Sequence, residues 1–196
     1  MINLEKISES LTNSICRHSN FDQKQKAQIY YALQLILGIL VEFFIVFIIS
    51  LVLNITDFVI TMMFSSLALR IFTGGAHCTS YDRCLVFTVV VYTFFSMLVK
   101  ISFLPYISLI VLTIVIVIIG FVIINNIKMQ FKNIGLIILI IWGIMMMSML
   151  LLKNDDLHLL KVLLSSCIGI SIQLFNLTSI GNIFINKCDS FLKRFI

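Results

Sequence analysis

The chain has 196 residues, of which 60% are hydrophobic and only 12% are charged, with a formal net charge of +5. A soluble domain carries about 25% charged residues and about 45–50% apolar ones, so the composition excludes an ordinary soluble protein. The basic balance does not indicate nucleic-acid binding, because the lysines and arginines punctuate long apolar runs, as orientation in a bilayer requires. We therefore expect an all-α integral membrane protein whose main partner is the lipid bilayer.

Residues 3–20 open the chain with a polar segment whose apolar positions recur at helical spacing. These positions are Leu4, Ile7, Leu11 and Ile15. The pattern predicts an amphipathic helix, which lies either on the membrane surface or against the protein's own loops. Residues 1–29 lack the apolar core of a cleavable signal peptide, and we interpret them as a cytoplasmic or interfacial N-terminal segment.

Residues 30–196 form the second expected unit, a single membrane domain. Its apolar segments lie at about 30–53, 55–73, 84–102, 105–125, 134–152 and 159–185. A helix of about 20 residues spans the hydrocarbon core, so the segments predict a bundle of about six transmembrane helices. With the N-terminus inside, eleven of the 14 lysines and arginines fall on the inner side. This asymmetry predicts a protein of the cell membrane with both termini in the cytoplasm.

The second and third segments are short. Only twelve residues separate Asp57 from Arg70, or about 18 Å of helix against a hydrocarbon thickness of about 30 Å. Either Arg70 reaches the surface from within the membrane, or the bundle has four full spans plus two short or re-entrant helices. Both short segments meet at the loop of residues 70–84. We expect this loop to line a cavity, because irregular backbone at membrane depth is tolerated only where protein or water covers it.

The loop concentrates the reactive side chains of the chain, in the order Arg-Ile-Phe-Thr-Gly-Gly-Ala-His-Cys-Thr-Ser-Tyr-Asp-Arg-Cys. A cysteine is a nucleophile only as its thiolate, which a nearby imidazole or cation makes available. His77 can take a thiol proton and later give one to a leaving amine. His77 and Cys84 would stand about 10.5 Å apart on a continuous helix, so we predict a break between them. The Gly74-Gly75 pair supplies the freedom to bring them together, and spacing alone leaves Cys78 open as an alternative nucleophile.

A metal site is another use for His77, Cys78 and Cys84, but a structural zinc site takes four ligands and a catalytic site three plus water. We expect neither a metal nor another cofactor. Glu42 lies near the centre of the first apolar segment, where an ionisable residue faces the bundle interior by default. It either pairs with Arg70, binds a polar part of a substrate, or stays protonated against a neighbouring helix.

The pattern Arg70-x3-Gly74-Gly75-x-His77-x6-Cys84, in a six-span protein of this length, resembles the AgrB (accessory gene regulator B) family. These are membrane cysteine endopeptidases that process the AgrD pro-peptide of quorum sensing. The resemblance implies that Cys84 and His77 form the catalytic dyad and that Cys78 is not catalytic. The residues expected to bind substrate or support the dyad are Arg70, Gly74, Gly75 and Glu42.

The resemblance also implies a reaction. Cys84 attacks a peptide carbonyl of an AgrD-like pro-peptide, and His77 protonates the leaving amine, which releases an acidic C-terminal tail. The peptide stays on Cys84 as a thioester until its own cysteine or serine closes a thiolactone or lactone ring.

A competing hypothesis is a small transporter or exporter of peptides that performs no covalent catalysis. It predicts paired discontinuous helices or several ionisable residues within the membrane, whereas this chain concentrates its polar residues in one loop. A homodimer is a further expectation, because a second copy would cover the short helices. For Gln173 and Asn176 in the last segment, hydrogen bonds between helices are expected rather than a substrate groove.

Overall fold

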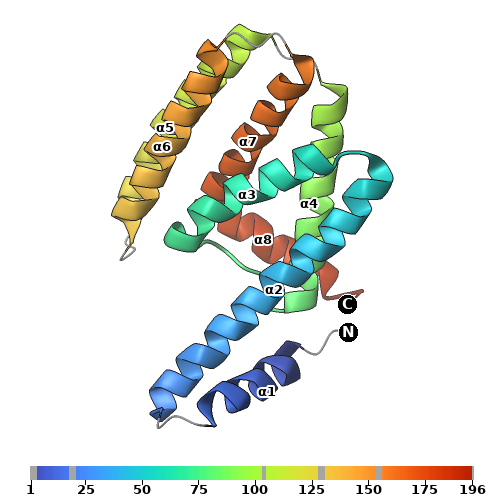
Figure 1. The fold of residues 1–196 in the computed structure, drawn as a ribbon, viewed down its shortest axis with the longest axis vertical. Helices are drawn as coiled ribbons and strands as arrows, with labels where there is room; N and C mark the ends of the chain where they lie inside the picture. The colour runs from blue at the N-terminus through green and yellow to red at the C-terminus, as the bar shows by residue number, and fades with distance from the viewer. Residues whose placement is uncertain (1–3, 18–20, 103–104, 128–130, 153–155, 196) are drawn as a thin grey trace.

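The computed structural model describes residues 4–17, 21–102, 105–127, 131–152 and 156–195, in which it has helices and no strand. The helices are α1 (Leu4–Cys16), α2 (Gln23–Leu53), α3 (Thr56–Thr73), α4 (Tyr81–Ile101), α5 (Tyr106–Asn126), α6 (Lys132–Leu151), α7 (Leu157–Asn176) and α8 (Ser179–Leu192). Figure 1 shows their arrangement. Among the described residues, six helices, α2 to α7, are long and apolar enough to cross a membrane. The predicted all-α membrane bundle is therefore confirmed.

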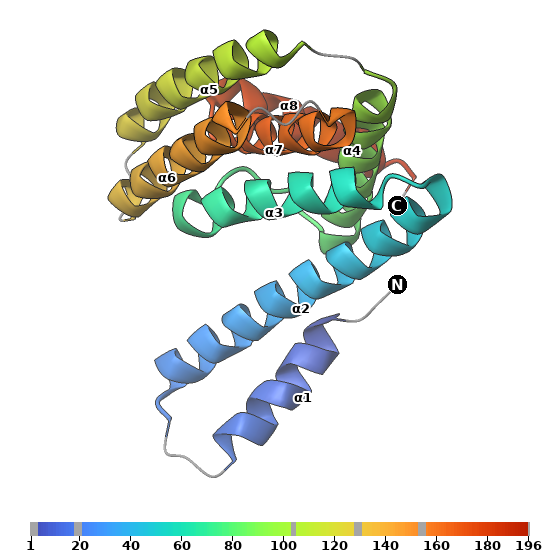
Figure 2. The ribbon, with the colours of Figure 1, turned by 45° about the horizontal axis from the view of Figure 1, so that its top comes forward.

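The first two helices stand partly apart from the others, since α1 and the first half of α2 project away from the bundle (Figures 1 and 2). The buried residues of α1, which packs against α2, are Ser8, Thr12 and Cys16. The predicted apolar stripe of α1 is open instead, with Ile7, Leu11 and Ile15 exposed. This arrangement favours contact of the stripe with lipid over contact with the protein's own loops.

Helix α2 begins at Gln23, upstream of the predicted start near residue 30. A capping box explains the early start, because the Asp22 side chain accepts a hydrogen bond from the Gln25 amide and the Gln25 side chain accepts one from the Asp22 amide (3.0 Å). The 31-residue helix is about 46 Å long, which exceeds the hydrocarbon thickness. Its first turns therefore extend beyond the apolar layer.

Helices α3 and α7 pack side by side in the centre of the fold. They run in the same direction, since Asp57 and His158 pair at their first turns (3.3 Å) and Thr73 and Gln173 pair near their ends (3.2 Å). At 18 residues, α3 is about 27 Å long and continuous. Because its two ends contact opposite ends of α7, α3 crosses the bundle as a spanning helix does.

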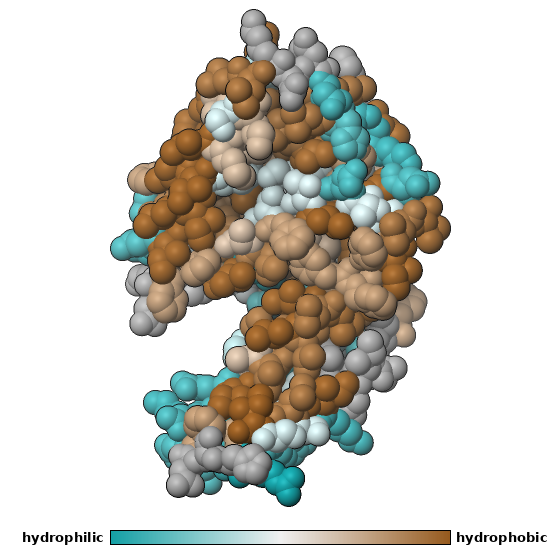
Figure 3. Space-filling model, in the orientation of Figure 1, coloured by the Kyte–Doolittle hydropathy of each residue, from teal (hydrophilic) through white to brown (hydrophobic). Residues whose placement is uncertain are grey.

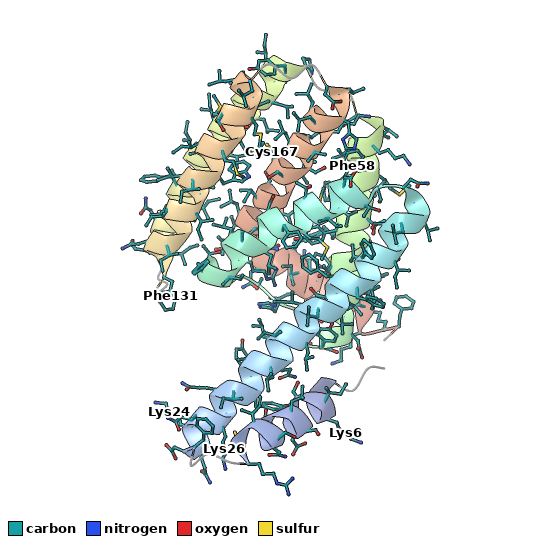
Figure 4. The ribbon with its side chains drawn as sticks, in the orientation of Figure 1. Lys6, Lys24, Lys26, Phe58, Phe131 and Cys167 are labelled. Atoms are coloured by element: carbon teal, nitrogen blue, oxygen red, sulfur yellow. The ribbon has the colours of Figure 1, made fainter. Side chains whose placement is uncertain are left out.

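The polar surface lies at the two ends of the bundle and the apolar surface between them (Figure 3). Figure 4 labels Lys6, Lys24 and Lys26 at the end that holds α1 and the start of α2, whereas Phe58 lies toward the opposite end. Connections between helices alternate between these ends, and the α3–α4 loop shares its end with the α7–α8 junction. The residues of the predicted catalytic loop are thus at one face of the membrane domain.

The expected last segment, 159–185, is wrong as one continuous span. Helix α7 ends at Asn176, and α8 begins at Ser179. The break has a local cause, because the Thr178 hydroxyl caps the new helix by accepting a hydrogen bond from the Gly181 amide at 3.0 Å. The chain consequently turns at residues 177–178, and α8 lies near the start of α4.

Candidate active site

The segment from Arg70 to Cys84 divides into a helix end, a loop and a helix start. Arg70 lies in the last turn of α3, residues 74–80 form the loop, and Cys84 lies in the first turn of α4. Two glycines make the turn, with φ of 64° at Gly74 and 146° at Gly75. Both values lie in the region that residues with a side chain avoid. The predicted break between His77 and Cys84 is therefore confirmed.

Helix α7 holds the first part of this loop. The Gln173 side chain donates hydrogen bonds to the Thr73 hydroxyl (3.2 Å) and to the Gly74 carbonyl (2.6 Å). The Ala76 amide donates to the carbonyl of Asn176 at 3.3 Å. The interhelical bonding expected of Gln173 is confirmed, whereas Asn176 contributes its backbone.

Helix α8 holds the second part of the loop through Asp189, a residue that the sequence analysis did not single out. Its carboxylate accepts hydrogen bonds from the Thr79 amide (3.3 Å) and the Thr79 hydroxyl (2.8 Å). The same carboxylate pairs with Arg83, with 3.4 Å between Oδ1 and Nε. The only sequence signal was an isolated carboxylate on a weakly polar C-terminal helix.

The imidazole of His77 is hydrogen-bonded to Arg70. Nη2 of Arg70 lies 2.9 Å from Nδ1 and 3.4 Å from Nε2 of the ring. Because arginine only donates, Nδ1 is the acceptor and the neutral ring carries its proton on Nε2. Loss of hydration in the loop, and then the charge of Arg70, lower the pKa of His77 below its usual value. His77 is accordingly neutral at neutral pH.

The thiol of Cys84 lies near the backbone of Cys78 and the side chain of Thr88. The thiol of Cys78 also contacts that of Cys84. Burial, and then the nearby Cys84 and Asp189, raise the pKa of Cys78 to about 12. Cys78 therefore remains a thiol at physiological pH.

Glu42 of α2 is near the same site, within electrostatic range of Arg70 and Cys84. Helix α2 is tied to the start of α4 nearby, because the Tyr81 hydroxyl donates to the carbonyl of Gly38 at 2.8 Å. A side chain at Gly38 would collide with the Tyr81 ring, since its Cβ would lie 2.9 Å from Cε2. The two glycine-dependent contacts, at Gly38 and at the loop, bring α2, α3 and α4 together around Cys84.

The predicted site residues thus lie on one side of the bundle, although the described contact of His77 is with Arg70 rather than with Cys84. His77 is bound to Arg70, and the contact of His77 with Cys84 stays a prediction. The five cysteines are free. Within the described part of the chain, no three His, Cys, Asp or Glu side chains are grouped closely enough to hold a metal ion.

Fold and site together define a multi-pass helical membrane protein that presents a histidine and a cysteine on a braced loop after its second spanning helix, and a second cysteine in the first turn of the third. The chain belongs to the AgrB family, since the family model described as "Accessory gene regulator B" matches residues 8–177. Membership links the protein to the accessory gene regulator system of quorum sensing.

Two relatives from Clostridium perfringens are similar over almost the whole chain. They are named "Putative AgrB-like protein" (strain SM101 / Type A) and "Putative AgrB-like protein 2" (strain 13 / Type A). Each is 28% identical over 213 aligned residues, which cover 98% of this chain and 100% of the relative. No solved structure matches the chain.

Proposed function

We propose that the protein is a membrane cysteine endopeptidase that cleaves the C-terminal tail from an AgrD-like pro-peptide, with Cys84 as nucleophile and His77 as proton carrier. The observation that carries the proposal is the placement of Cys84. Its sulfur is beside the Cys78 amide, in the first turn of α4, and the loop that supplies this amide also carries His77. A cysteine thiol attacks only after a base has taken its proton, and the imidazole of His77 on the adjoining loop is the base that this proposal assigns.

Arg70 has two successive roles in this mechanism. In the substrate-free protein it occupies Nδ1 of His77, so the ring has no free acceptor for a thiol proton. An acidic peptide tail then pairs with the guanidinium and releases the imidazole. The neutral ring takes the proton of Cys84, and the charge on Arg70 binds the part of the substrate that will leave.

Cleavage follows from this arrangement. The Cys84 thiolate adds to the carbonyl carbon of the scissile bond, the carbon–nitrogen bond breaks, and the His77 imidazolium gives its proton to the departing amine. The acyl group remains on Cys84 as a thioester. A cysteine or serine of the same peptide then attacks that carbonyl, forms the ring, and returns the sulfur of Cys84 as the leaving group.

Ring closure competes with hydrolysis of the thioester. Transfer from one thiol to another is close to neutral in free energy, whereas hydrolysis is downhill, so a good ring yield needs water to be kept away. A site covered by helices and lipid meets this need. Holding the peptide's own nucleophile near the thioester raises its effective concentration further.

Orientation and assembly form part of the same proposal. Lys6, Lys24 and Lys26 lie in α1 and the first turns of α2, at one end of the molecule (Figure 4), which supports a cytoplasmic N-terminus by the charge rule. The six candidate spans among the described residues are an even number, which supports a cytoplasmic start of α8 as well. The two-part division at residue 29 and the homodimer stay predictions, the second of which crosslinking in liposomes would test.

The deciding experiment reconstitutes the protein in liposomes with an AgrD-like peptide and follows the products by mass spectrometry. Wild type is compared with Cys84→Ala, His77→Ala and Cys78→Ala. We expect cleavage and a peptide adduct on Cys84 in wild type, loss of cleavage in the first two variants, and its retention in the third. Cleavage by Cys84→Ala would overturn the proposal that Cys84 is the nucleophile, whereas absence of cleavage by wild type would favour the transporter hypothesis.

A further inference from the structure

Asp189 is a buried carboxylate on α8 with no part in the mechanism above. Its residue is 7% exposed, although α8 is a short helix whose other face is open, with Ile183, Phe184 and Phe191 exposed. Burial of a carboxylate costs free energy unless hydrogen bonds and an opposite charge compensate it. The compensating groups all come from the segment just before Cys84.

Two residues, Thr79 and Arg83, supply the polar groups around this carboxylate. The Thr79 amide and hydroxyl donate to Asp189 at 3.3 and 2.8 Å. Arg83 pairs with Oδ1 at 3.4 Å and also donates from Nη2 to the Thr79 hydroxyl at 2.9 Å. The Arg83 side chain is 12% exposed, and among the described residues its Nη1 has no hydrogen-bond partner. Asp189 is thus the counter-charge of a nearly buried guanidinium.

The contacts bracket the start of α4. Thr79 precedes the N-cap Ser80, and Arg83 is the residue next to Cys84. The Cys84 amide donates to the Ser80 carbonyl at 3.1 Å, which closes the first turn. A displacement of Thr79 or Arg83 would therefore move the turn that carries the sulfur.

We infer that Asp189 is a positioning residue that fixes the Cys84 thiol by clamping Thr79 and Arg83 to α8. The inference rests on the proposed function and extends it to a helix outside the region that the family model matches, which ends at residue 177. In this role α8 is a structural part of the active site. Asp189 itself touches neither Cys84 nor substrate.

The test compares Asp189→Asn and Asp189→Ala with the matched control Asn186→Ala in liposomes. Asn186 is exposed on the same helix, and its side chain donates to the side chain of Asn182 within α8. Displacement of a nucleophile by about 1 Å costs up to about a hundredfold in rate. We expect kcat to fall by roughly ten- to a hundredfold in both Asp189 variants with KM unchanged, while the control keeps the wild-type kcat.

A double variant separates positioning from a general loss of folding. Asp189→Asn leaves the Arg83 charge without its partner, so the added change Arg83→Gln removes that charge and should not lower kcat further. Rates are expressed per reactive Cys84, which is counted by exhaustive iodoacetamide labelling. The single variant Arg83→Gln completes the comparison. Unchanged kcat in Asp189→Asn and Asp189→Ala would overturn the inference, and so would a loss of kcat in the double variant equal to the product of the losses in Asp189→Asn and Arg83→Gln.

A second readout does not depend on peptide cleavage. The initial rate of iodoacetamide labelling at Cys84, followed by peptide mapping, should differ between wild type and Asp189→Asn by more than it differs between wild type and Asn186→Ala. Equal labelling rates would overturn the positioning role even if wild type cleaves the peptide. If wild type does not cleave, the proposed function fails, and the labelling rates still decide the role of Asp189.

Discussion

Arg70 and His77 meet across the two-glycine turn, with Nη2 of the guanidinium 2.9 Å from Nδ1 of the imidazole. The contact joins the last turn of α3 to the loop that precedes α4. It places a permanent positive charge against a base, which disfavours the imidazolium. The pairing therefore sets the protonation state with which the site meets its substrate.

The first prediction concerns the pH dependence of Arg70→Gln. The pKa of His77 is below its usual value, first through loss of hydration and then through Arg70. The neutral ring of the free enzyme thus persists to lower pH than that of an ordinary histidine, and wild-type kcat/KM, which reports the free enzyme, should decline only at lower pH. Removal of the Arg70 charge raises the pKa of His77, so the decline in kcat/KM should move to higher pH.

The measurement is kcat/KM between about pH 5 and 8, where histidine ordinarily titrates, with Arg194→Gln as a control that removes an exposed positive charge near the C-terminus. The control should keep the wild-type profile. A profile for Arg70→Gln that coincides with wild type would show that Arg70 does not act on the imidazole.

A second prediction concerns Gln173, whose side chain binds both Thr73 and the Gly74 carbonyl. Gln173→Leu removes these bonds and leaves the carbonyl without that donor, at a cost of about 1–3 kcal/mol. Part of this cost should appear as loosening of the loop, and kcat should fall. Ser171→Ala is the matched control on α7, because the Ser171 hydroxyl bonds only to the Cys167 carbonyl within its own helix.

The check is kcat in liposomes together with the thermal unfolding midpoint in detergent. Retention of both values by Gln173→Leu would mean that the α7 contacts do not brace the loop.

The sequence was sufficient for the parts of the site that depend on local chemistry. A glycine pair before His77 predicted the break, and the apolar run after Cys84 placed that cysteine at a helix start. The contacts that hold the loop in place could not be predicted in the same way, because Thr79 and Asp189 are far apart in the chain and meet only once α7 and α8 have packed. The α7–α8 break was missed for a related reason: one threonine cap outweighs a nearly continuous apolar pattern.

The third prediction separates the two neighbouring cysteines. With its pKa raised to about 12, Cys78 is almost entirely protonated at pH 8, and a thiol in that state reacts slowly with iodoacetamide. We expect negligible labelling of Cys78 under conditions that label Cys84, and retained cleavage by Cys78→Ser. Peptide mapping after timed labelling provides the measurement, and faster labelling of Cys78 than of Cys84 would reverse the assignment of the nucleophile.

The fourth prediction tests the central helix pair through Gly169. A Cβ at this position would overlap the backbone carbonyl of Met62, and backbone atoms have no alternative rotamer to adopt. Gly169→Ala must therefore push α3 away from α7, which we expect to cost about 1–3 kcal/mol through overpacking. Because α3 carries Arg70 and Thr73, the same displacement should lower kcat.

Gly143→Ala is the matched control for this change. Its Cβ would meet only a methyl group of the Val117 side chain, at 2.7 Å, and a side chain can shift where a carbonyl cannot. Unfolding followed by circular dichroism in detergent should therefore give a lower midpoint for Gly169→Ala than for Gly143→Ala. Equal midpoints would mean that α3 and α7 can separate without loss of stability, and the α3–α7 pair would then not be what fixes Arg70 opposite His77.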